Sequence, residues 1–399
     1  MLPLQNRFLK FLGQTSEEPA LLDIVRAEGV RLYDRSGNSY IDLISGVSVS
    51  STGHSNREVT EAVKSQVDSY MHLMVYGEFV QAPQVEYAEK LLSLLPPPFG
   101  SIFFVNSGSE AVEGALKLAR KETGRKGIVS FENGYHGSTY GALSVQGSDH
   151  YSKSFGPLLP AVKRGIFNHF DALDLITEEV SSVIVEPIQA EAGVVEPHPQ
   201  FLESLRERCN ETGTILIFDE CQTGLGRTGK GFAFEHYGVV PDIIVLAKAL
   251  GGGMPLGAFV SSPRMMKSLS VNPPLGHITT FGGHPVCCAA GLASLNYSLR
   301  NDLAANASDI SQLIRARLDH PAIKEIRGRG LLLAIELASC EMASKVVKMA
   351  PRFGIVVDLF LFRENSIRVA PPLTINMQEA EEACSRLLEL IEAAAGKRD

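Results

Sequence analysis

Two ionisable residues of this 399-residue chain stand directly after apolar runs, where a charge is costly unless it has a partner. Asp219 follows the four apolar residues 215–218, and Lys248 follows the apolar run 243–247. A carboxylate in such a place needs a cationic or proton-donating partner. A lysine there is either a surface charge on a long apolar stem or an amine that attacks a carbonyl carbon. The residues around Lys248 leave both interpretations open.

Two turns of small residues follow other apolar runs. In the turn Asn-Ser-Gly-Ser, Gly108 and Ser109 would present backbone N–H groups at the start of a helix, which attracts an anion. An ordinary helix cap on Ser107 or Ser109 is the alternative. Tyr135 follows another apolar run and has glycines close by on both sides, so its ring could cover a flat ligand. The adjacent His136 is either a base or a structural residue.

Together these four segments supply a set of groups that few ligands need. They offer a cradle for a phosphate, a cover for an aromatic ring, a carboxylate for a ring nitrogen and an amine that forms an imine. Asp219 beside a pyridinium N–H would keep that nitrogen protonated and make the ring an electron sink. The sequence therefore predicts an enzyme that uses pyridoxal phosphate (pyridoxal 5'-phosphate), with Lys248 as its attachment point.

Alternating strands and helices must position these segments. Between residues 55 and 300 the chain predicts six buried strands separated in several places by helices, such as those over 110–121 and 200–212. This pattern is typical of an α/β fold with a mainly parallel central sheet flanked by helices. Ligands of such a sheet bind beyond the carboxyl ends of the strands. The strands are expected over 101–105, 127–131, 182–186, 214–219, 242–246 and 256–261.

The two ends of the chain predict a second, smaller α/β domain. Residues 22–44 alternate short apolar runs with turns, which indicates a small antiparallel sheet. Beyond about residue 305, helices mix with short strands expected over 331–336, 355–358 and 366–369. We expect residues 51–300 to form the large cofactor-binding domain, and residues 1–50 and 301–399 the two parts of the small domain.

Composition narrows the possible partners. The net charge of −8, without a long block of either sign, disfavours nucleic acid and anionic membranes as partners. Six cysteines without paired spacing indicate reduced thiols, and scattered histidines predict no metal site. No apolar run is long enough for a signal peptide core or a membrane span, so we expect a cytoplasmic protein.

Six separated motifs resemble the class III aminotransferases of pyridoxal phosphate fold type I, over most of the chain. They are Asn-Ser-Gly-Ser-Glu-Ala (106–111), Tyr-His-Gly (135–137), Glu-Pro-Ile-Gln-Ala-Glu-Ala-Gly (186–193), Asp-Glu-Cys-Gln-Thr-Gly-Leu-Gly-Arg-Thr-Gly (219–229), Lys-Ala-Leu-Gly-Gly-Gly (248–253) and Thr-Phe-Gly-Gly-His-Pro (280–285). The resemblance implies that Gly108 and Ser109 hold the phosphate and that Tyr135 stacks on the ring. It also implies that Asp219 pairs with the ring nitrogen, Gln222 bonds the ring hydroxyl, and Lys248 forms the internal aldimine as a Schiff base and carries the proton.

The same resemblance implies partners and an activity. Thr280 resembles the residue that reaches the phosphate of the neighbouring subunit, which implies a homodimer with shared active sites. Arg368 resembles the arginine that clamps the carboxylate of glutamate or 2-oxoglutarate, and Glu191 the glutamate that masks it. The expected reaction is ping-pong transfer of a terminal amino group, from an acetylornithine- or ornithine-like amine to 2-oxoglutarate.

One departure from the family leaves the amine donor open. Ser138 stands where ornithine, acetylornithine and GABA aminotransferases usually have an arginine for the distal carboxylate of the amine. We expect Tyr70 and Tyr76 to lie in a segment that lines the amine pocket, although its composition names no substrate. The alternatives within the cofactor class are another ω-aminotransferase, using pyruvate or 2-oxoglutarate, and an aminomutase, which would have no second substrate for Arg368 to clamp.

Two alternatives lie outside the cofactor class. Residues 224–229 match GxGxxG, the fingerprint of an NAD-dependent oxidoreductase, but no helix is predicted to start there. The overlapping match to a phosphate-binding loop has Gly231 where a hydroxyl for Mg²⁺ is needed. A related binding protein without catalysis would be expected to lack Lys248 or Asp219, and both are present.

Overall fold

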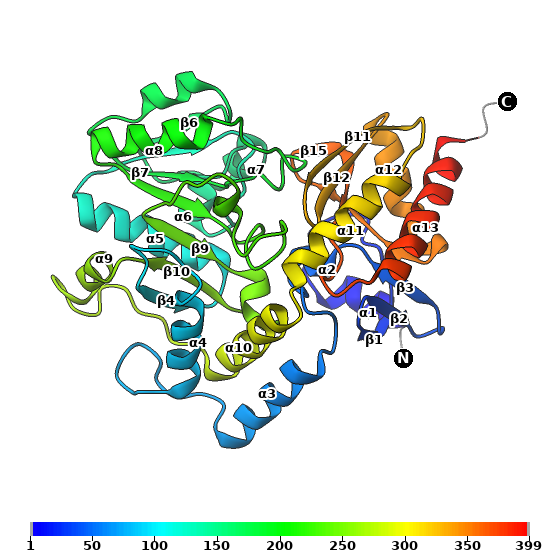
Figure 1. The fold of residues 1–399 in the computed structure, drawn as a ribbon, viewed down its shortest axis with the longest axis horizontal. Coiled ribbons are helices and arrows are strands. Elements are labelled where there is room, and N and C mark those ends of the chain that lie inside the picture. The colour runs from blue at the N-terminus through cyan, green and yellow to red at the C-terminus, as the bar shows by residue number, and fades with distance from the viewer. Residues whose placement is uncertain (1–2, 397–399) are drawn as a thin grey trace.

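A seven-stranded sheet lies at the centre of the larger part of the molecule, in a computed structural model that describes residues 3–396 (Figure 1). The strand order is β4-β10-β9-β8-β7-β5-β6. Strand β10 runs antiparallel to both neighbours and the remaining pairs are parallel, so the prediction of a mainly parallel sheet is confirmed. The strands are β4 (Ser101–Val105), β5 (Gly127–Phe131), β6 (Val162–Gly165), β7 (Val180–Val185), β8 (Ile215–Asp219), β9 (Ile243–Leu246) and β10 (Gly257–Ser261).

Helices cover both faces of this sheet, which is why its strands are apolar at nearly every position. In β8, the side chain of Ile217 belongs to the core beneath α5 (Gly108–Thr123). Leu216 and Phe218 belong to the opposite core, with residues of α4 (Ala82–Leu92), α8 (Phe201–Thr212) and α10 (Pro285–Arg300). The carboxyl ends of the parallel strands are therefore held between two packed layers.

The smaller part contains two four-stranded sheets, ordered β1-β2-β3-β13 and β11-β12-β15-β14. Ile41 from the N-terminal segment and Leu333 from the C-terminal segment belong to one hydrophobic core. That shared core supports the division into residues 1–50, 51–300 and 301–399, which we retain as a proposal. The strands are β1 (Ile24–Glu28), β2 (Arg31–Asp34), β3 (Ser39–Asp42), β11 (Ile323–Arg329), β12 (Leu332–Leu337), β13 (Ile355–Val356), β14 (Asp358–Phe360) and β15 (Arg363–Val369).

The structure differs from the predicted strands at residues 355–358, and it adds β6 and β11, which were not predicted. The single strand expected over 355–358 is wrong: β13 pairs in parallel with β3, whereas β14 pairs with β15 in the other sheet. The buried Val357 marks the break, so that one short apolar run serves two sheets. Strand β6 was not predicted, because Lys163 and Arg164 interrupt its apolar pattern; an edge strand tolerates such residues because part of it faces solvent.

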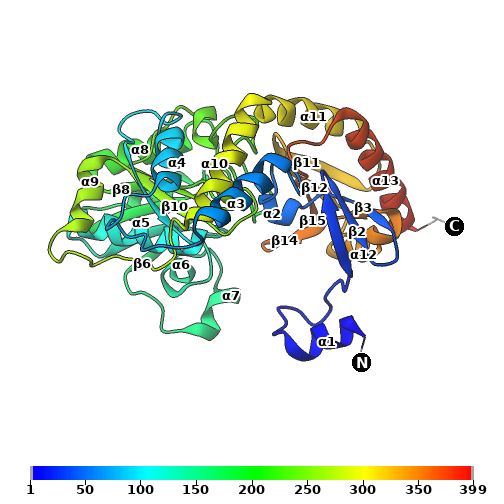
Figure 2. The ribbon, with the colours of Figure 1, turned by 90° about the horizontal axis from the view of Figure 1, so that it is seen from below.

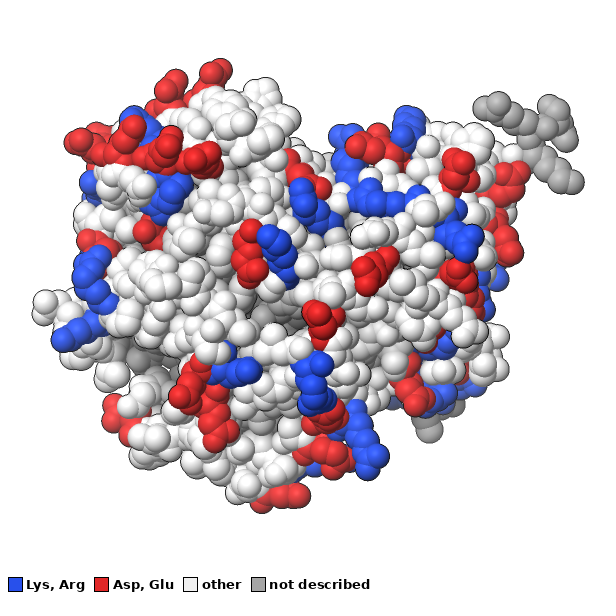
Figure 3. Space-filling model, in the orientation of Figure 1, with Lys and Arg blue, Asp and Glu red and all other residues white. Residues whose placement is uncertain are grey.

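Helix α1 (Leu4–Phe11) stands apart from the rest of the molecule (Figure 2), and all its residues are exposed. Across residues 3–396, no helix is both long and apolar enough to cross a membrane. On the face shown in Figure 3, positive and negative side chains lie interspersed. The other helices are α2 (Ser45–Ser48), α3 (Arg57–Ser69), α6 (Tyr140–Ser144), α7 (Asp149–Ser152), α9 (Pro263–Lys267), α11 (Leu303–Arg317), α12 (Cys340–Met349) and α13 (Met377–Ala395), with short 3₁₀ turns that include η3 (Ala233–His236) and η4 (Lys248–Gly251).

Candidate active site

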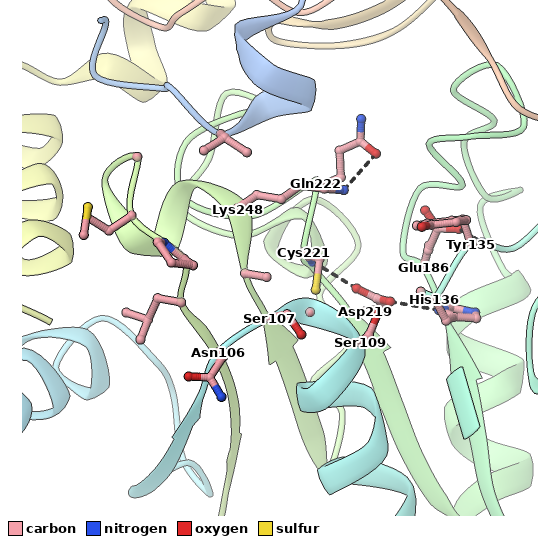
Figure 4. A pocket seen from close by; sticks show the side chains of 18 residues that line it. Asn106, Ser107, Ser109, Tyr135, His136, Glu186, Asp219, Cys221, Gln222 and Lys248 are labelled. Carbon is pink, nitrogen blue, oxygen red and sulfur yellow. Dashed lines mark hydrogen bonds and ion pairs between the residues drawn. The ribbon is translucent and has the colours of Figure 1, made fainter. Parts of the chain in front are cut away.

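A cavity of about 500 Å³ opens at the carboxyl edge of the large sheet (Figure 4). Every parallel strand except the edge strand β6 delivers polar residues to it. The cavity is lined by Asn106, Ser107, Gly108 and Ser109 after β4, Tyr135 and His136 after β5, Glu186 after β7, Asp219, Cys221 and Gln222 at the end of β8, and Lys248 after β9. The structure thus brings together the residues predicted to hold the cofactor, except Thr280.

Lys248 enters the cavity from a strained turn. Its backbone φ is +53°, in the left-handed region that non-glycine residues rarely occupy. Its Nζ donates a hydrogen bond to Oε1 of Gln222 at 3.2 Å. Nε2 of the same amide is buried without a protein partner, so it is a donor available to a guest.

Asp219 is held ready for a positively charged partner. Its Oδ2 lies 2.8 Å from Nδ1 of His136, and its Oδ1 accepts a hydrogen bond from the backbone N–H of Cys221 at 3.0 Å. Burial acts to raise the pKa of the Asp219 carboxyl. The hydrogen bond and charge of His136, together with hydrogen bonds from Cys221, outweigh this effect, and the pKa of Asp219 is lowered. His136 is therefore the partner that keeps Asp219 ionised, a role that the sequence did not separate from a structural one.

The turn after β4 is shaped to admit an anion at the N-terminus of α5. Oγ of Ser107 accepts a hydrogen bond from the N–H of Glu110 at 3.2 Å, so Ser107 is the helix cap. A side chain on Gly108 would meet the Sγ of Cys221 at 3.1 Å, and one on Gly137 would meet the Oγ of Ser109 at 2.1 Å. Glycine at both positions therefore lets the backbone pack closely against these side chains, next to the N-terminus of α5 where an anion is favoured.

A second buried carboxylate, not singled out from the sequence, faces the same cavity. Oε1 of Glu186 accepts the N–H of Tyr135 at 2.9 Å, and Oε2 accepts the N–H of Ala190 at 3.0 Å. Burial raises the pKa of Glu186 to about 7, although the charge of His136 opposes this. The signal was available in the sequence, because Glu186 ends an apolar run as Asp219 does.

Ser138 lies beside the tyrosine at the cavity. Its Oγ is 3.4 Å from the hydroxyl oxygen of Tyr135, and its backbone N–H donates to the Oγ of Ser109 at 3.2 Å. The side chain is exposed, and it brings no charge to this position.

Arg368 and Glu191 form a buried ion pair outside the lining of the cavity. Nη2 of Arg368 donates to Oε2 of Glu191 at 2.9 Å, and Nη1 lies 2.9 Å from Oε1. Nε is 3.3 Å from Oδ1 of Asp358, whose pKa burial raises to about 6 against the charge of Arg368. The predicted pairing of these two residues is present in the geometry, and its role in substrate exchange remains a prediction.

Besides Ser138, Arg368 and Glu191, three further predicted site residues lie outside the lining of this cavity. Tyr70 directly follows α3, and Tyr76 lines surface hollows beside Ile102 and Phe103. Thr280 is exposed, although the neighbouring Thr279 accepts a hydrogen bond from the amide of Asn106. The expectation that Tyr70 and Tyr76 line the amine pocket stays a prediction.

The residues present fit pyridoxal phosphate. The turn at Gly108 lines the cavity at the N-terminus of α5 and suits a phosphate, the ionised Asp219 suits a protonated ring nitrogen, and the unpartnered Nε2 of Gln222 suits a ring oxygen. Lys248 supplies the amine within reach of that amide. The fold and the cavity together define an enzyme of the pyridoxal phosphate class.

The chain belongs to the class III aminotransferases: the model of the family "Aminotransferase class-III" matches residues 12–391. It is 38% identical over 395 residues to an acetylornithine aminotransferase of Caldanaerobacter subterraneus subsp. tengcongensis, covering 96% of this chain and 97% of that protein. It is also 38% identical to a succinylornithine transaminase of Yersinia pseudotuberculosis, covering 95% and 94%. The protein is thus an aminotransferase that uses pyridoxal phosphate and resembles those that act on acylated ornithines.

Solved structures agree with this assignment. The ornithine aminotransferase of Toxoplasma gondii ME49 superposes with a TM-score of 0.91 at 30% identity, covering 100% of this chain and 97% of that one. An omega transaminase of Pseudomonas jessenii in complex with PMP also gives a TM-score of 0.91, at 26% identity, covering 99% and 98%.

The family assignment overturns the oxidoreductase alternative for residues 224–229. In the structure these residues form a turn in which Gly226 and Gly229 have φ of +94° and +91°. Between them the buried Arg227 donates hydrogen bonds to the carbonyls of Leu331 and Pro371. The glycines shape a contact between the two parts of the molecule.

Proposed function

We propose that this aminotransferase moves the terminal amino group of an amine or ω-amino acid, of the acetylornithine or ornithine type, to 2-oxoglutarate. The observation that carries the proposal is the buried pair of Glu191 and Arg368. A guanidinium suits the carboxylate of a dicarboxylic acid. Glu191 neutralises that guanidinium while an uncharged chain occupies the site, so one site serves two different substrates in turn.

Some residues of the cavity would bind the cofactor, and others would transfer protons. Gly108 and Ser109 would hold the phosphate, Tyr135 would cover the ring, and the Nε2 of Gln222 would donate to the ring hydroxyl. Pyridoxal phosphate supplies the carbonyl that takes up the amino group and the ring that withdraws electrons.

Two of these residues act on protons. Asp219, held ionised by His136, keeps the proton on the ring nitrogen. Nζ of Lys248 would take the proton from the substrate carbon that bears the nitrogen. It would pass that proton, within the same half-reaction, to the carbon that was the carbonyl carbon of the cofactor, so that the lysine itself ends unchanged.

A homodimer with shared active sites completes the proposal. Thr280 is exposed, and so are the large apolar side chains of Ile278 and Phe281 near it in the chain. The side chain of Met71, between Tyr70 and Tyr76, is exposed as well. A second copy on this surface would bury them, take Thr280 toward the partner's phosphate, and bring Tyr70 and Tyr76 to the partner's amine pocket.

The second candidate function is transamination from an amine donor that has no carboxylate at the position facing Ser138. The hydroxyl of Ser138 lies against that of Tyr135, and a hydroxyl cannot form an ion pair with a carboxylate. Another ω-amine, with pyruvate or 2-oxoglutarate as acceptor, fits this feature.

The two half-reactions can be tested separately. The holoenzyme mixed with glutamate alone should release one 2-oxoglutarate per site and lose the visible absorption of the lysine-bound cofactor. The product enzyme should then be regenerated by 2-oxoglutarate but not by an amine. A panel of acylornithines, ornithine and simple diamines identifies the donor by the same spectral change. Failure of glutamate together with success of alanine would overturn 2-oxoglutarate as acceptor.

A further inference from the structure

One buried carboxylate joins two loops that come from different parts of the sequence. Glu186 is only 5% exposed and follows β7, next to β8 in the sheet. One of its oxygens accepts the backbone N–H of Tyr135, and the other accepts that of Ala190. Figure 4 shows Glu186 and Tyr135 on the same side of the cavity.

One of these N–H groups belongs to the loop at the cofactor site, and the other belongs to the loop that carries the partner of Arg368. Tyr135 is the residue that faces the cofactor site, and Ala190 immediately precedes Glu191, the partner of Arg368. A second contact joins the same loops, because Nε2 of Gln189 donates to the carbonyl of Glu132 at 2.8 Å. The segment from Glu186 to Ala190 is therefore fixed relative to the tyrosine loop.

We propose that Glu186 is a positioning residue that sets, through one carboxylate, both the placement of Tyr135 against the cofactor and the placement of Glu191 against Arg368. This inference rests on the proposed function, since it takes the roles of Tyr135, Glu191 and Arg368 from it. It adds a physical link between cofactor binding and carboxylate selection.

The chemistry of the contact requires a carboxylate. Two N–H donors from different loops need two acceptor oxygens, and a glutamine offers one oxygen and one NH₂ group. In Glu186→Gln, one loop keeps its acceptor while the other N–H faces a donor in a buried place. The substitution changes the size of the side chain little, so it tests the link rather than the packing.

Glu220 provides a matched control. It is 1% exposed, its carboxylate accepts the N–H groups of Ala233 and Phe234 at 2.9 and 2.8 Å, and burial raises its pKa to about 7. Those two residues belong to η3, away from the lining of the cavity. Glu220→Gln therefore makes the same change of charge and donors in an equally buried place.

The experiment compares wild type, Glu186→Gln and Glu220→Gln by amide hydrogen exchange of the cofactor-free protein. In Glu186→Gln, the protection of the Tyr135 or the Ala190 amide should fall about tenfold or more, because an NH₂ donor replaces one of the two acceptor oxygens. Glu220→Gln should leave both amides protected. Unchanged protection of both amides in Glu186→Gln would overturn the proposal.

The functional readout follows from which amide opens. Loss at Tyr135 should speed the release of pyridoxal phosphate about tenfold, and loss at Ala190 should raise the KM for glutamate about tenfold with little change for the amine. The proposal would also be overturned if the Tyr135 amide lost protection without faster release of the cofactor, or the Ala190 amide lost protection without a higher KM for glutamate. Both changes are measured relative to Glu220→Gln. A wild-type enzyme that does not react with glutamate would instead overturn the proposed function, and the exchange result would still stand.

A second variant covers the case in which Glu186→Gln does not fold. Glu186→Asp keeps both oxygens and shortens the side chain by one methylene, so both amides should lose part of their protection together. If neither amide lost protection in Glu186→Asp, or only one did, the two contacts would be independent. That result would contradict the proposal that Glu186 places both loops.

Discussion

Nη2 of Arg368 donates a hydrogen bond to Oε2 of Glu191 at 2.9 Å, although 176 residues separate them in the chain. Arg368 comes from β15 of the smaller part of the molecule, and Glu191 from the loop after β7 of the larger part. Both side chains are buried, so each neutralises a charge that would otherwise be costly. A substrate carboxylate that pairs with Arg368 must take the place of Glu191.

Arg368→Ala should raise the KM for glutamate and 2-oxoglutarate about ten- to hundredfold, because a charge-assisted contact to the carboxylate is lost. The KM for the amine donor should change little, since that substrate leaves Arg368 paired with Glu191. Steady-state kinetics with each substrate varied in turn measures both values. Equal changes in the two half-reactions would reject the clamp.

Glu191→Gln is the complementary variant, because it leaves Arg368 without its charge partner. It should weaken the amine half-reaction more than the glutamate half-reaction. The opposite order would show that Glu191 contacts the dicarboxylate itself.

Lys248→Ala should abolish turnover and the visible absorption of the lysine-bound cofactor, because no other residue of the cavity carries an amine side chain. Lys248→Gly should be equally inactive but more stable than Lys248→Ala by about 1 kcal/mol, because glycine tolerates the φ of +53° at this position. Absorption spectra and urea midpoints of the two variants provide the test. Full activity in either variant would reject the assignment of Lys248.

The buried carboxyl of Glu220 should make the stability of the cofactor-free protein depend on pH. Burial raises its pKa from 4.5 to about 7, so the folded state binds more protons than the unfolded state between these values. The contribution of Glu220 is therefore fully present below pH 4.5 and is lost as the pH rises through about 7. Glu220→Gln cannot ionise, so it should gain about 3 kcal/mol relative to wild type between pH 4.5 and 7. Urea unfolding of both proteins at the two pH values measures this difference, and a constant difference would contradict it.

Arg227 should hold the two parts of the molecule together. Its Nη1 donates to the carbonyls of Leu331 and Pro371 at 2.9 and 2.6 Å, and its guanidinium is fully buried. Arg227→Met should lower the free energy of unfolding by about 3 kcal/mol or more, because these buried carbonyls lose their donor.

The exposed Arg300, which pairs with Glu58, is the control for Arg227. Arg300→Met should cost less than about 1 kcal/mol. Thermal unfolding of both variants gives the comparison, and similar losses would show that the buried contacts of Arg227 contribute little.

Much of the site could be predicted because it follows the strand ends. A charged residue after an apolar run marks the carboxyl edge of a parallel sheet, and both Asp219 and Lys248 carry that signal. Glu186 carries the same signal but was not predicted as a site residue. The groups of the cofactor had already been assigned to other residues, so none was left to pair with this glutamate. Strand β6 was missed because an edge strand with two basic residues lacks the apolar run of its neighbours.

The sequence alone determined the class of chemistry, because side-chain type and the alternation of buried strands with helices are local properties of the chain. It also determined most of the strands, whose burial on both faces leaves a continuous apolar signal. Only the tertiary structure decided which residues meet. Nothing local indicates that His136 holds Asp219, that Glu186 holds Tyr135, or that residues 355–358 divide between two sheets. Such contacts join segments distant in sequence, and they arise only when the packed core fixes where each strand ends.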